Sequence, residues 1–117
     1  MQLTGKAIIR VDGQELRTDP GATLNPGGVK RNPIPDSRGQ THYNEENVSP
    51  ELECKLHHGA DISLKAMNDI TGATVIFECD TGAQFILREA FTLEPLTLDS
   101  KEGRAPLKMS ALTCEEV

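Results

Sequence analysis

The sequence is poor in aromatic residues. Its 117 residues contain no Trp, one Tyr and three Phe, while hydrophobic residues of all kinds make up 37% of the chain. A chain of this length can bury a core without disulfide or metal staples. We therefore expect a single domain spanning residues 1–117, with a thin and mostly aliphatic core in which the Phe rings are the largest side chains.

Long apolar runs are also absent. Within the first thirty residues the longest run is Ala7-Ile8-Ile9, whereas a membrane helix needs about 20 apolar residues and a signal peptide needs an apolar segment of its own. The sequence thus predicts neither a signal peptide nor a membrane partner. We expect the protein to be made in the cytoplasm.

Positive charge is scarce. The chain has 12 basic and 18 acidic residues, for a formal net charge of -6, and its longest basic cluster is Lys30-Arg31. Sequence-independent affinity for nucleic acids comes from Lys and Arg side chains that neutralise phosphates. This composition therefore argues against nucleic-acid capture.

Recognisable catalytic and metal-binding motifs are missing as well. There is no GxSxG nucleophile elbow, and Asn25-Pro26-Gly27-Gly28 lacks the GxxxxGK[ST] pattern of a phosphate loop. His57-His58 and the cysteines have no CxxC or HxxxH spacing, and adjacent histidines in a strand point to opposite faces. The widely spaced Cys54, Cys79 and Cys114 are expected to be buried free thiols. The sequence predicts no catalytic residue, no metal and no cofactor.

What the chain does contain is a strong strand pattern between Gly72 and Leu93. Apolar and polar residues alternate on either side of an Asp80-Thr81-Gly82 turn, as in a hairpin of two half-buried strands. Ile76 and Ile86 fall on the face away from the core, which implies either a second packed layer or a partner surface. The residues predicted to face the core are Val75, Phe77, Cys79, Phe85, Leu87, Phe91 and Leu93.

Two other segments have clear strand patterns. The Asp12-Gly13 pair, between Ala7–Val11 and Gln14–Arg17, predicts a two-residue hairpin loop. Residues 51–57 alternate cleanly between apolar and charged side chains, so one face of that strand is expected to be wet. Its predicted core residues are Leu52, Cys54 and Leu56.

One short helix is predicted from Asp61 to about Asn68, with Asp61 as the N-cap and an apolar stripe that must dock on a sheet. A last strand is predicted from about Ala105 to Cys114. The parity of its apolar residues switches once, as a β-bulge would produce.

The segment from Thr18 to about His42 is rich in proline and glycine. Four of the seven prolines lie in it, so regular strand ladders are not expected there. A structureless stretch of that length is unusual inside a compact domain. It is interpreted either as a floppy surface loop or as an arm that becomes ordered on a neighbouring subunit.

Together these patterns predict a mainly β fold. The expected architecture is an antiparallel β-sandwich or barrel-like domain with one short helix and the long loop at about residues 18–42. Such a domain has strand edges with unpaired backbone groups, and Ile76 and Ile86 are apolar side chains predicted to lie outside the core. The sequence therefore favours a self-associating protein over a monomer.

Several segments carry a resemblance to a known family. They are GKAIIRVDGQELRTDPGATLNPGGVKRNP near the start, NVSPELECKL and DITGATVIFECDTGAQFILREAFT in the middle, and APLKMSALTCEEV at the end. On these residues, of which VDG and GATLNPGGVKR are the most specific, the chain resembles the tail tube proteins of Mu-like contractile-tailed phages over nearly its whole length. No catalytic motif belongs to that family.

The resemblance implies a structural virion protein, related in fold to the hemolysin-coregulated protein of type VI secretion. Subunits would form hexameric rings that stack into the inner tail tube, assembled in the host bacterial cytoplasm. The implied partners are other copies of the chain, the tail sheath and tape-measure proteins, and the baseplate and tail terminator proteins. DNA would pass through the tube without being specifically bound.

Two sets of site residues follow as expectations. An inter-subunit contact arm comprises Leu24, Asn25, Pro26, Gly27, Gly28, Val29, Lys30 and Arg31. Candidates for an acidic lumen are Glu51, Glu53, Glu78, Asp80 and Glu89. A ring of six subunits would carry about 6 × 6 = 36 negative charges, and a lumen of that sign would repel phosphates and let DNA slide.

A function of another class stays open from the residues alone. A monomeric β-barrel could bind a small ligand or a peptide in a cavity lined by the central hairpin. Sedimentation and electron microscopy distinguish a monomer of that kind from an assembling subunit.

Overall fold

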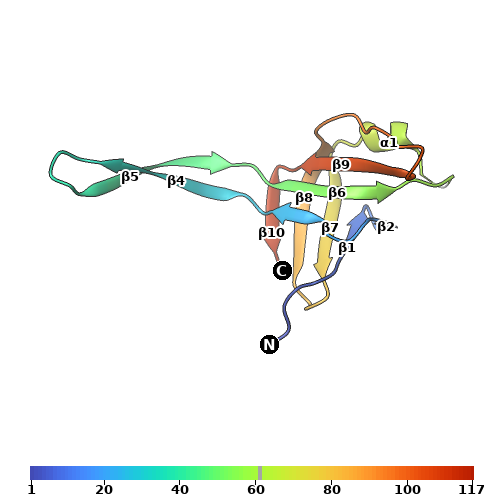
Figure 1. Ribbon diagram of the computed structural model, residues 1–117, viewed down its shortest axis with the longest axis horizontal. Helices are drawn as coiled ribbons and strands as arrows, with labels where there is room; N and C mark the ends of the chain where they lie inside the picture. The colour runs from blue at the N-terminus through green and yellow to red at the C-terminus, as the bar shows by residue number, and fades with distance from the viewer. Residues whose placement is uncertain (61) are drawn as a thin grey trace.

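The computed structural model describes residues 1–60 and 62–117. It consists of a barrel-like body from which one long hairpin projects to one side (Figure 1). This hairpin, residues 28–48, is called the arm below. The strands are β1 (Ala7–Val11), β2 (Gln14–Leu16), β3 (Thr23–Asn25), β4 (Gly28–Pro35), β5 (Thr41–Val48), β6 (Glu51–His57), β7 (Ala73–Cys79), β8 (Gln84–Thr92), β9 (Arg104–Ser110) and β10 (Thr113–Glu116), and the helix is α1 (Leu64–Asn68). No helix in the described ranges is long and apolar enough to cross a membrane.

The body is one antiparallel sheet folded into two crossed layers. Its strand order is β2-β1-β7-β8-β9-β6-β3, and β10 also pairs with β8. The first half of β8 pairs with β7 and β10, whereas its end at Phe91 and Thr92 pairs with β9. In Figure 1, β6 and β9 accordingly run across the direction of β7 and β8. The predicted mainly β, antiparallel fold is confirmed.

A bulge in β8 makes this bend possible. Ala73 pairs with Ala90 and Val75 with Leu87, so two steps on β7 face three on β8. Glu89 takes up the extra residue with a φ of 54°, a left-handed conformation that is uncommon outside glycine. No pattern in the sequence predicts this bulge, which moves the inward face from Leu87 to Ala90.

The prediction that Phe91 and Leu93 face the core is therefore wrong. Their side chains are 38% and 43% exposed, whereas Ala90 is completely buried. Strict alternation from Leu87 would place residues 89, 91 and 93 inside, but one extra residue inverts that parity.

The two ends of the sheet meet, which closes the body into a barrel. Thr18, two residues beyond β2, forms a bridge with Leu56 of β6 at the far end of the strand order. The His57 N–H donates to the Arg17 carbonyl over 2.7 Å, and the Asp19 N–H donates to the Lys55 carbonyl over 3.0 Å. Closure leaves fewer unpaired edges for the body to protect.

The core inside this barrel is aliphatic, as predicted. The largest fully buried side chains are Ile9, Leu52, Leu56, Val75, Leu87, Leu107 and Met109. Phe77 and Phe85 meet edge to face, with ring centroids 6.4 Å apart. Both predicted core residues Leu52 and Leu56 are completely buried, because the alternation in β6 matches the strand period of two.

Both predicted hairpin turns are also confirmed. At Asp12-Gly13 the φ angles are 50° and 86°, the pair of positive values that a two-residue type I′ loop requires. The Thr74 N–H donates to the Asp12 carboxylate over 2.9 Å, which ties this turn to β7. In the second turn the Gly82 N–H donates to the Cys79 carbonyl over 3.0 Å.

The helix is shorter than predicted. It begins at Leu64, and the Ser63 hydroxyl caps it by accepting from the Ala66 N–H over 3.3 Å. The predicted N-cap, Asp61, lies outside the described residues. Met67 is the buried member of the helix, and its carbonyl accepts from the Thr92 hydroxyl over 2.6 Å. These contacts hold a five-residue helix that would not persist alone in water.

The predicted last strand is two strands rather than one strand with a bulge. β9 pairs with β6, whereas β10 pairs with β8. The parity switch at Ala111 and Leu112 marks the point where the chain passes from one layer to the other. Ala111 is buried there, and Leu112 is 72% exposed.

Candidate subunit-interaction site

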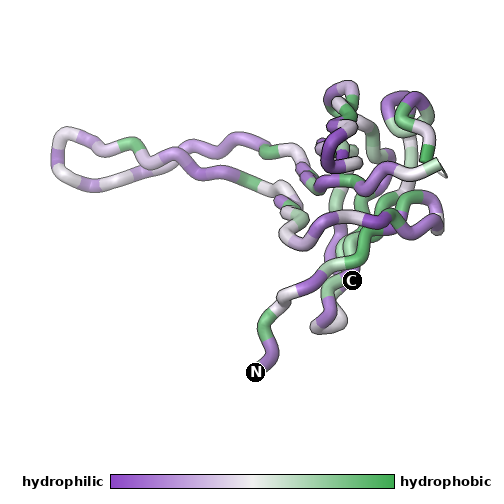
Figure 2. The backbone as a smooth tube through the Cα atoms, turned by 45° about the vertical axis from the view of Figure 1, so that its right-hand side comes forward, coloured by the Kyte–Doolittle hydropathy of each residue, from purple (hydrophilic) through white to green (hydrophobic). Residues whose placement is uncertain are grey.

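The arm is the feature that sets this molecule apart from a compact barrel. β4 and β5 pair along their whole length, from Gly28 opposite Val48 to Pro35 opposite Thr41, and every residue of β5 is exposed. The radius of gyration is 17.3 Å, against roughly 13 Å for a compact domain of this size. Figure 2 shows an arm that is mostly hydrophilic, with a few hydrophobic positions along it.

The prediction of a long irregular loop over residues 18–42 is wrong, because β3, β4 and the start of β5 lie within it. In a two-stranded ribbon, every second residue points its N–H away from the partner strand. Pro33 and Pro35 are two residues apart, so both can place the missing N–H on that unpaired edge. Proline breaks a central strand but not an isolated ribbon.

The arm has no core of its own. Residues directly opposite one another share a face. On one face Lys30 lies 3.7 Å from Glu46. On the other, Arg31 lies 3.7 Å from Glu45 and 5.8 Å from the centre of the Tyr43 ring. Exposed ion pairs contribute at most about 1 kcal/mol each, and a lone two-stranded hairpin is only marginally stable in water. The contacts within the arm therefore stabilise it only weakly.

Its turn is held by one carboxylate. Asp36 accepts from the Arg38 N–H over 2.9 Å and from the Gln40 N–H over 3.0 Å, and it lies 3.0 Å from the His42 ring. The hydrogen bond from Gln40, followed by those from His42 and Arg38, holds the pKa of Asp36 below its usual value. Gly39, with a φ of 80°, completes the turn.

The predicted contact residues fall on three parts of this region. Leu24 and Asn25 belong to β3 and pair with β6 of the body. Pro26 and Gly27 form the base of the arm. Gly28, Val29, Lys30 and Arg31 are the near half of β4. The structure thus places Gly28–Arg31 on the arm and Leu24–Asn25 in the barrel wall.

Sequence reasoning missed the outer half of the arm and all of β5. Asn44 to Asn47, with their two glutamates, lie within β5. A signal was present: Asp36-Ser37-Arg38-Gly39 is a plausible turn between two segments of equal length, each with a β-forming residue, Ile34 and Tyr43.

Gly27 fixes the direction in which the arm leaves the body. Its φ is 78°, and an added Cβ would lie 2.7 Å from the Val48 carbonyl oxygen and 2.9 Å from the Pro50 nitrogen. No side chain fits at that distance. The Asn25 side chain accepts from the Gly27 N–H over 3.0 Å, which holds the same bend.

The predicted lumen residues do not form one surface. Glu51 and Glu53 lie on β6, where Glu53 is 3.7 Å from Lys108 of β9. Glu78 lies on β7 in the other layer and forms an ion pair with Arg10. Asp80 follows β7 in the hairpin turn, and Glu89 occupies the bulge where the layers meet. The five acids therefore divide between the two layers and the bend that joins them.

Ile76 and Ile86 pair directly on the outer face of the β7–β8 layer. Both are partly buried, and Ile8 of the adjacent strand is 40% exposed. Two ion pairs flank them, one between Arg10 and Glu78 and one between Arg88 and Glu115. Nothing within the described subunit seals these isoleucines, which favours the partner-surface interpretation over a second packed layer.

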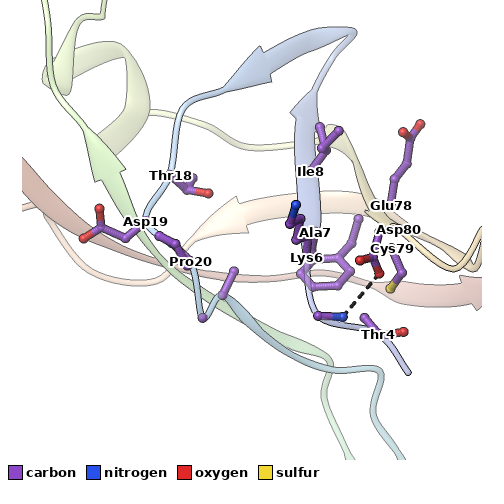
Figure 3. Close-up of a pocket in the computed structure, with 14 residues that line it drawn as sticks. Thr4, Lys6, Ala7, Ile8, Thr18, Asp19, Pro20, Glu78, Cys79 and Asp80 are labelled. Atoms are coloured by element: carbon purple, nitrogen blue, oxygen red, sulfur yellow. Dashed lines mark hydrogen bonds between the residues drawn. The ribbon is translucent and has the colours of Figure 1, made fainter. Parts of the chain in front are cut away.

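A groove of about 760 Å³ opens between the start of β1 and the segment from Thr18 to Ala22. Figure 3 shows Ala7 and Ile8 on one side and Thr18 to Pro20 on the other, with Cys79 and Asp80 beside β1. β2 pairs only with Ile9–Val11, so the first half of β1 faces the groove without a strand partner on that side.

One wall of the groove is held by Asp19. Its carboxylate bonds to the His57 ring and accepts from Arg104 Nε over 2.8 Å. The hydrogen bond from His57, followed by that from Arg104, holds the pKa of Asp19 below its usual value against the opposing effect of partial burial. His57 lies on the face of β6 that was predicted to be exposed to solvent. It is half-buried in a cluster with Asp19 and Arg104, which links the two ends of the sheet.

The prediction of buried free thiols is correct only for Cys54, because Cys79 and Cys114 are partly exposed. All three are free, and burial raises the pKa of Cys54 to about 12. Burial, followed by the charge of Glu115, also raises the pKa of Cys114. Such thiols are poor nucleophiles. Across residues 1–60 and 62–117, no three His, Cys, Asp or Glu side chains are placed to hold a metal ion.

Comparisons with known proteins agree with this architecture. The chain matches the family described as phage tail tube protein over residues 1–116. It is 37% identical over 116 residues to the Mu-like prophage FluMu tail tube protein of Haemophilus influenzae, a match that covers 99% of this chain and 97% of that protein. It is 33% identical over 101 residues to the tail tube protein of Escherichia phage Mu, covering 86% of this chain and 85% of that one.

The fold is also similar to a solved structure. A chain in the sheath/tube terminator of the PVC extracellular contractile injection system, in its extended state, superposes with a TM-score of 0.69 at 11% identity, covering 96% of this chain and 93% of that one. By sequence over nearly its full length, and by fold, this chain belongs to the phage tail tube protein family.

Proposed function

We propose that this chain builds the inner tail tube by associating with copies of itself into hexameric rings that stack end to end. Membership of the family makes it a structural component of the virion and not an enzyme. The arm is the observation that supports self-association most directly, since an exposed ribbon without a core is stabilised only by a partner. Residues 1–117 are proposed to act as one domain in this assembly.

The contact set on the arm is proposed to extend beyond the residues expected from sequence. Gly28–Arg31 provide its near half, while Pro26 and Gly27 set its direction. The exposed Ile34 and Tyr43 extend the set towards the tip. Leu24 and Asn25 act indirectly, by anchoring the arm through the pairing of β3 with β6.

The bore is proposed to carry negative charge that keeps DNA moving. The net charge of -6 per subunit supports this, because like charges repel the phosphate backbone. Since the five candidate acids divide between two layers, a strand face presented to the bore brings either Glu51 and Glu53 or Glu78 and Asp80 into it. Charge reversal of Glu51 and Glu53, read out as DNA retention in isolated tails, distinguishes the two faces, because retention rises only if β6 lines the bore.

The proposed partners outside the ring are the tail sheath, tape-measure, baseplate and tail terminator proteins. Similarity to a chain from a sheath/tube terminator complex of a contractile injection system supports this set. The monomeric ligand-binding barrel is set aside, because the family to which the chain belongs is structural.

Electron microscopy and sedimentation of the purified protein test the proposal. Rings of six or stacked tubes are expected as the protein concentration rises. A protein that remains monomeric at every concentration, with no rings in the micrographs, would contradict it.

A further inference from the structure

We propose that the groove beside β1 receives the tip of the arm of a second copy of this chain. This inference rests on the proposed self-assembly and adds the two surfaces that meet. In the single subunit the groove has an open strand edge and the arm tip has exposed apolar side chains. The two surfaces also carry opposite charges.

The groove has an apolar interior and an open strand edge. Ala7, Ile8, Pro20, Ala22, Phe77 and Cys79 contribute its apolar lining. Ile8 is 40% exposed although it belongs to a strand of the barrel. Lys6 to Ile8 have no strand partner on the groove side, since β2 begins its pairing at Ile9. An extended segment can add to such an edge through backbone hydrogen bonds while its side chains enter the groove.

The arm tip presents extended backbone with apolar side chains. Pro33, Ile34, Pro35 and Tyr43 are all exposed, and Tyr43 keeps 62% of its surface in water. An aromatic ring beside prolines is an effective anchor, because little side-chain entropy is lost when it is buried. The tip is therefore suited to an apolar groove.

Charge favours the same match. Three acids line the groove, Asp19, Glu78 and Asp80, against one base, Lys6. Asp19 and Glu78 have basic partners within the subunit. The Asp80 carboxylate is exposed and accepts from the Gly5 N–H over 3.2 Å (Figure 3). No basic side chain among the described residues forms an ion pair with it.

Arg38 is the complementary group on the arm. It lies in the turn at the tip, where its backbone N–H is bound to Asp36. No described carboxylate forms an ion pair with its guanidinium. Arg38 and Asp80 are thus an exposed cation and an exposed anion, each without an opposite charge, on the two surfaces that we propose to join.

Geometry requires that the tip come from another copy. β4 and β5 run straight out from the body (Figure 1). Eight residues per strand at about 3.3 Å each give an arm of about 26 Å, and the long dimension of the molecule is 63 Å. The arm reaches away from its own groove and far enough to lie across a neighbouring subunit.

A charge-swap experiment tests the pairing in the full-length chain. Arg38→Glu and Asp80→Arg are each expected to raise the concentration needed for assembly by about tenfold, and the double variant is expected to recover to within about threefold of wild type. Sedimentation measures the assembled fraction. Lys101→Glu and Glu94→Arg are matched controls, because they reverse exposed charges outside both surfaces and are expected to assemble like wild type.

The outcomes separate this inference from the proposed function. If wild type assembles but the double variant is no better than the single ones, the arm-to-groove match is overturned and the tube function stands. If wild type never assembles, both fall. Circular dichroism of each variant establishes that it is folded, as expected for substitutions in exposed turns.

A photo-crosslinking amino acid at Tyr43 provides a measurement that does not depend on charge. When this variant is assembled together with wild-type protein, the peptides crosslinked in the second copy are expected to contain residues 4–8, 18–22 or 77–80. Crosslinks confined to residues outside these three segments, such as those of β6 or β9, would overturn the assignment.

Discussion

The body and the arm of this molecule are stabilised in different ways, although both are antiparallel β structure. In the body, the longer strands β1, β6, β7, β8 and β9 each bury one face, and seven large side chains are fully buried. In the arm, β4 and β5 bury almost nothing. Burial of a Leu or Ile side chain contributes about 1.5–3 kcal/mol, so the body is stable by itself and the arm is not. The part of the chain that contributes least to folding is the part that we propose for assembly.

Removal of the arm is the strongest test of this comparison. If residues 29–47 are replaced by a two-residue turn, the body is expected to fold with an almost unchanged melting temperature, because no core residue is lost. Assembly is expected to be abolished. Thermal unfolding followed by circular dichroism measures the first effect, and sedimentation measures the second. Tubes formed by the shortened protein would refute the separation of roles.

Core and arm substitutions should differ sharply in their effect on the free energy of unfolding. Leu107→Ala is expected to reduce it by about 2–5 kcal/mol, since the residue is only 1% exposed and its loss leaves a cavity. Ile34→Ala, on the arm, is expected to change it by less than about 0.5 kcal/mol. Urea unfolding of both variants measures these values. Equal effects would mean that the arm contributes to the stability of the body.

Two glycines offer a matched pair at the junction and the tip of the arm. Gly27 and Gly39 have φ angles of 78° and 80°, but only Gly27 has backbone atoms within 3 Å of an added Cβ. Gly39→Ala is expected to cost about 1 kcal/mol for the left-handed conformation alone. Gly27→Ala is expected to cost clearly more and to change the direction of the arm.

Hydrogen exchange of the arm and the assembly concentration measure the effect of each glycine substitution. Similar results for the two variants would show that the junction adapts without strain, and would argue against a fixed direction for the arm.

Acid should weaken the seam of the body through Asp19. Because its pKa is lowered in the folded protein from an ordinary value of 3.8, its contribution to stability is fully present above that value and is lost as the pH falls through the lower folded pKa. Wild type and Asp19→Asn are therefore expected to differ most near neutral pH, to approach each other as the pH falls below 3.8, and to converge only below the lower folded pKa. Urea midpoints across this range measure the difference.

Asp36→Asn is the control for this experiment in the arm. The pKa of Asp36 is also lowered, but its bonds lie within the turn of the ribbon. It is expected to leave the unfolding of the body unchanged at every pH. A pH-dependent difference in body stability between Asp36→Asn and wild type would contradict the independence of the two regions.

The comparison also explains which features could be predicted from the sequence. Leu52 and Leu56 were placed correctly in the core, and Asp12-Gly13 correctly in a turn, because strand alternation and turn chemistry depend on neighbouring residues. Phe91 was placed wrongly, because the bulge at Glu89 occurs where β8 passes from one layer to the other. The residues next to Glu89 do not predict this bulge.

The contact residues predicted from the sequence cover only part of the arm. The likeness of GATLNPGGVKR to a tail tube family located the base and near half of the arm. The pairing of Lys30 with Glu46 and of Pro33 with Tyr43 was not foreseen, because proline was taken to exclude a strand. That rule holds for central strands, where both edges need donors, and it fails for a ribbon with one free edge on each strand.

The local structure outside the arm, the aliphatic core, the acidic net charge and the family could be predicted from the sequence alone. These depend on residue type and on spacing along the chain. The closure of the sheet at Thr18 and Leu56, the bend in β8, and the projection of a proline-rich segment as an arm beside an open groove depend on the three-dimensional fold. Those features arise from pairing between distant residues. A free strand edge can be recognised only once the pairing of all the other strands is known.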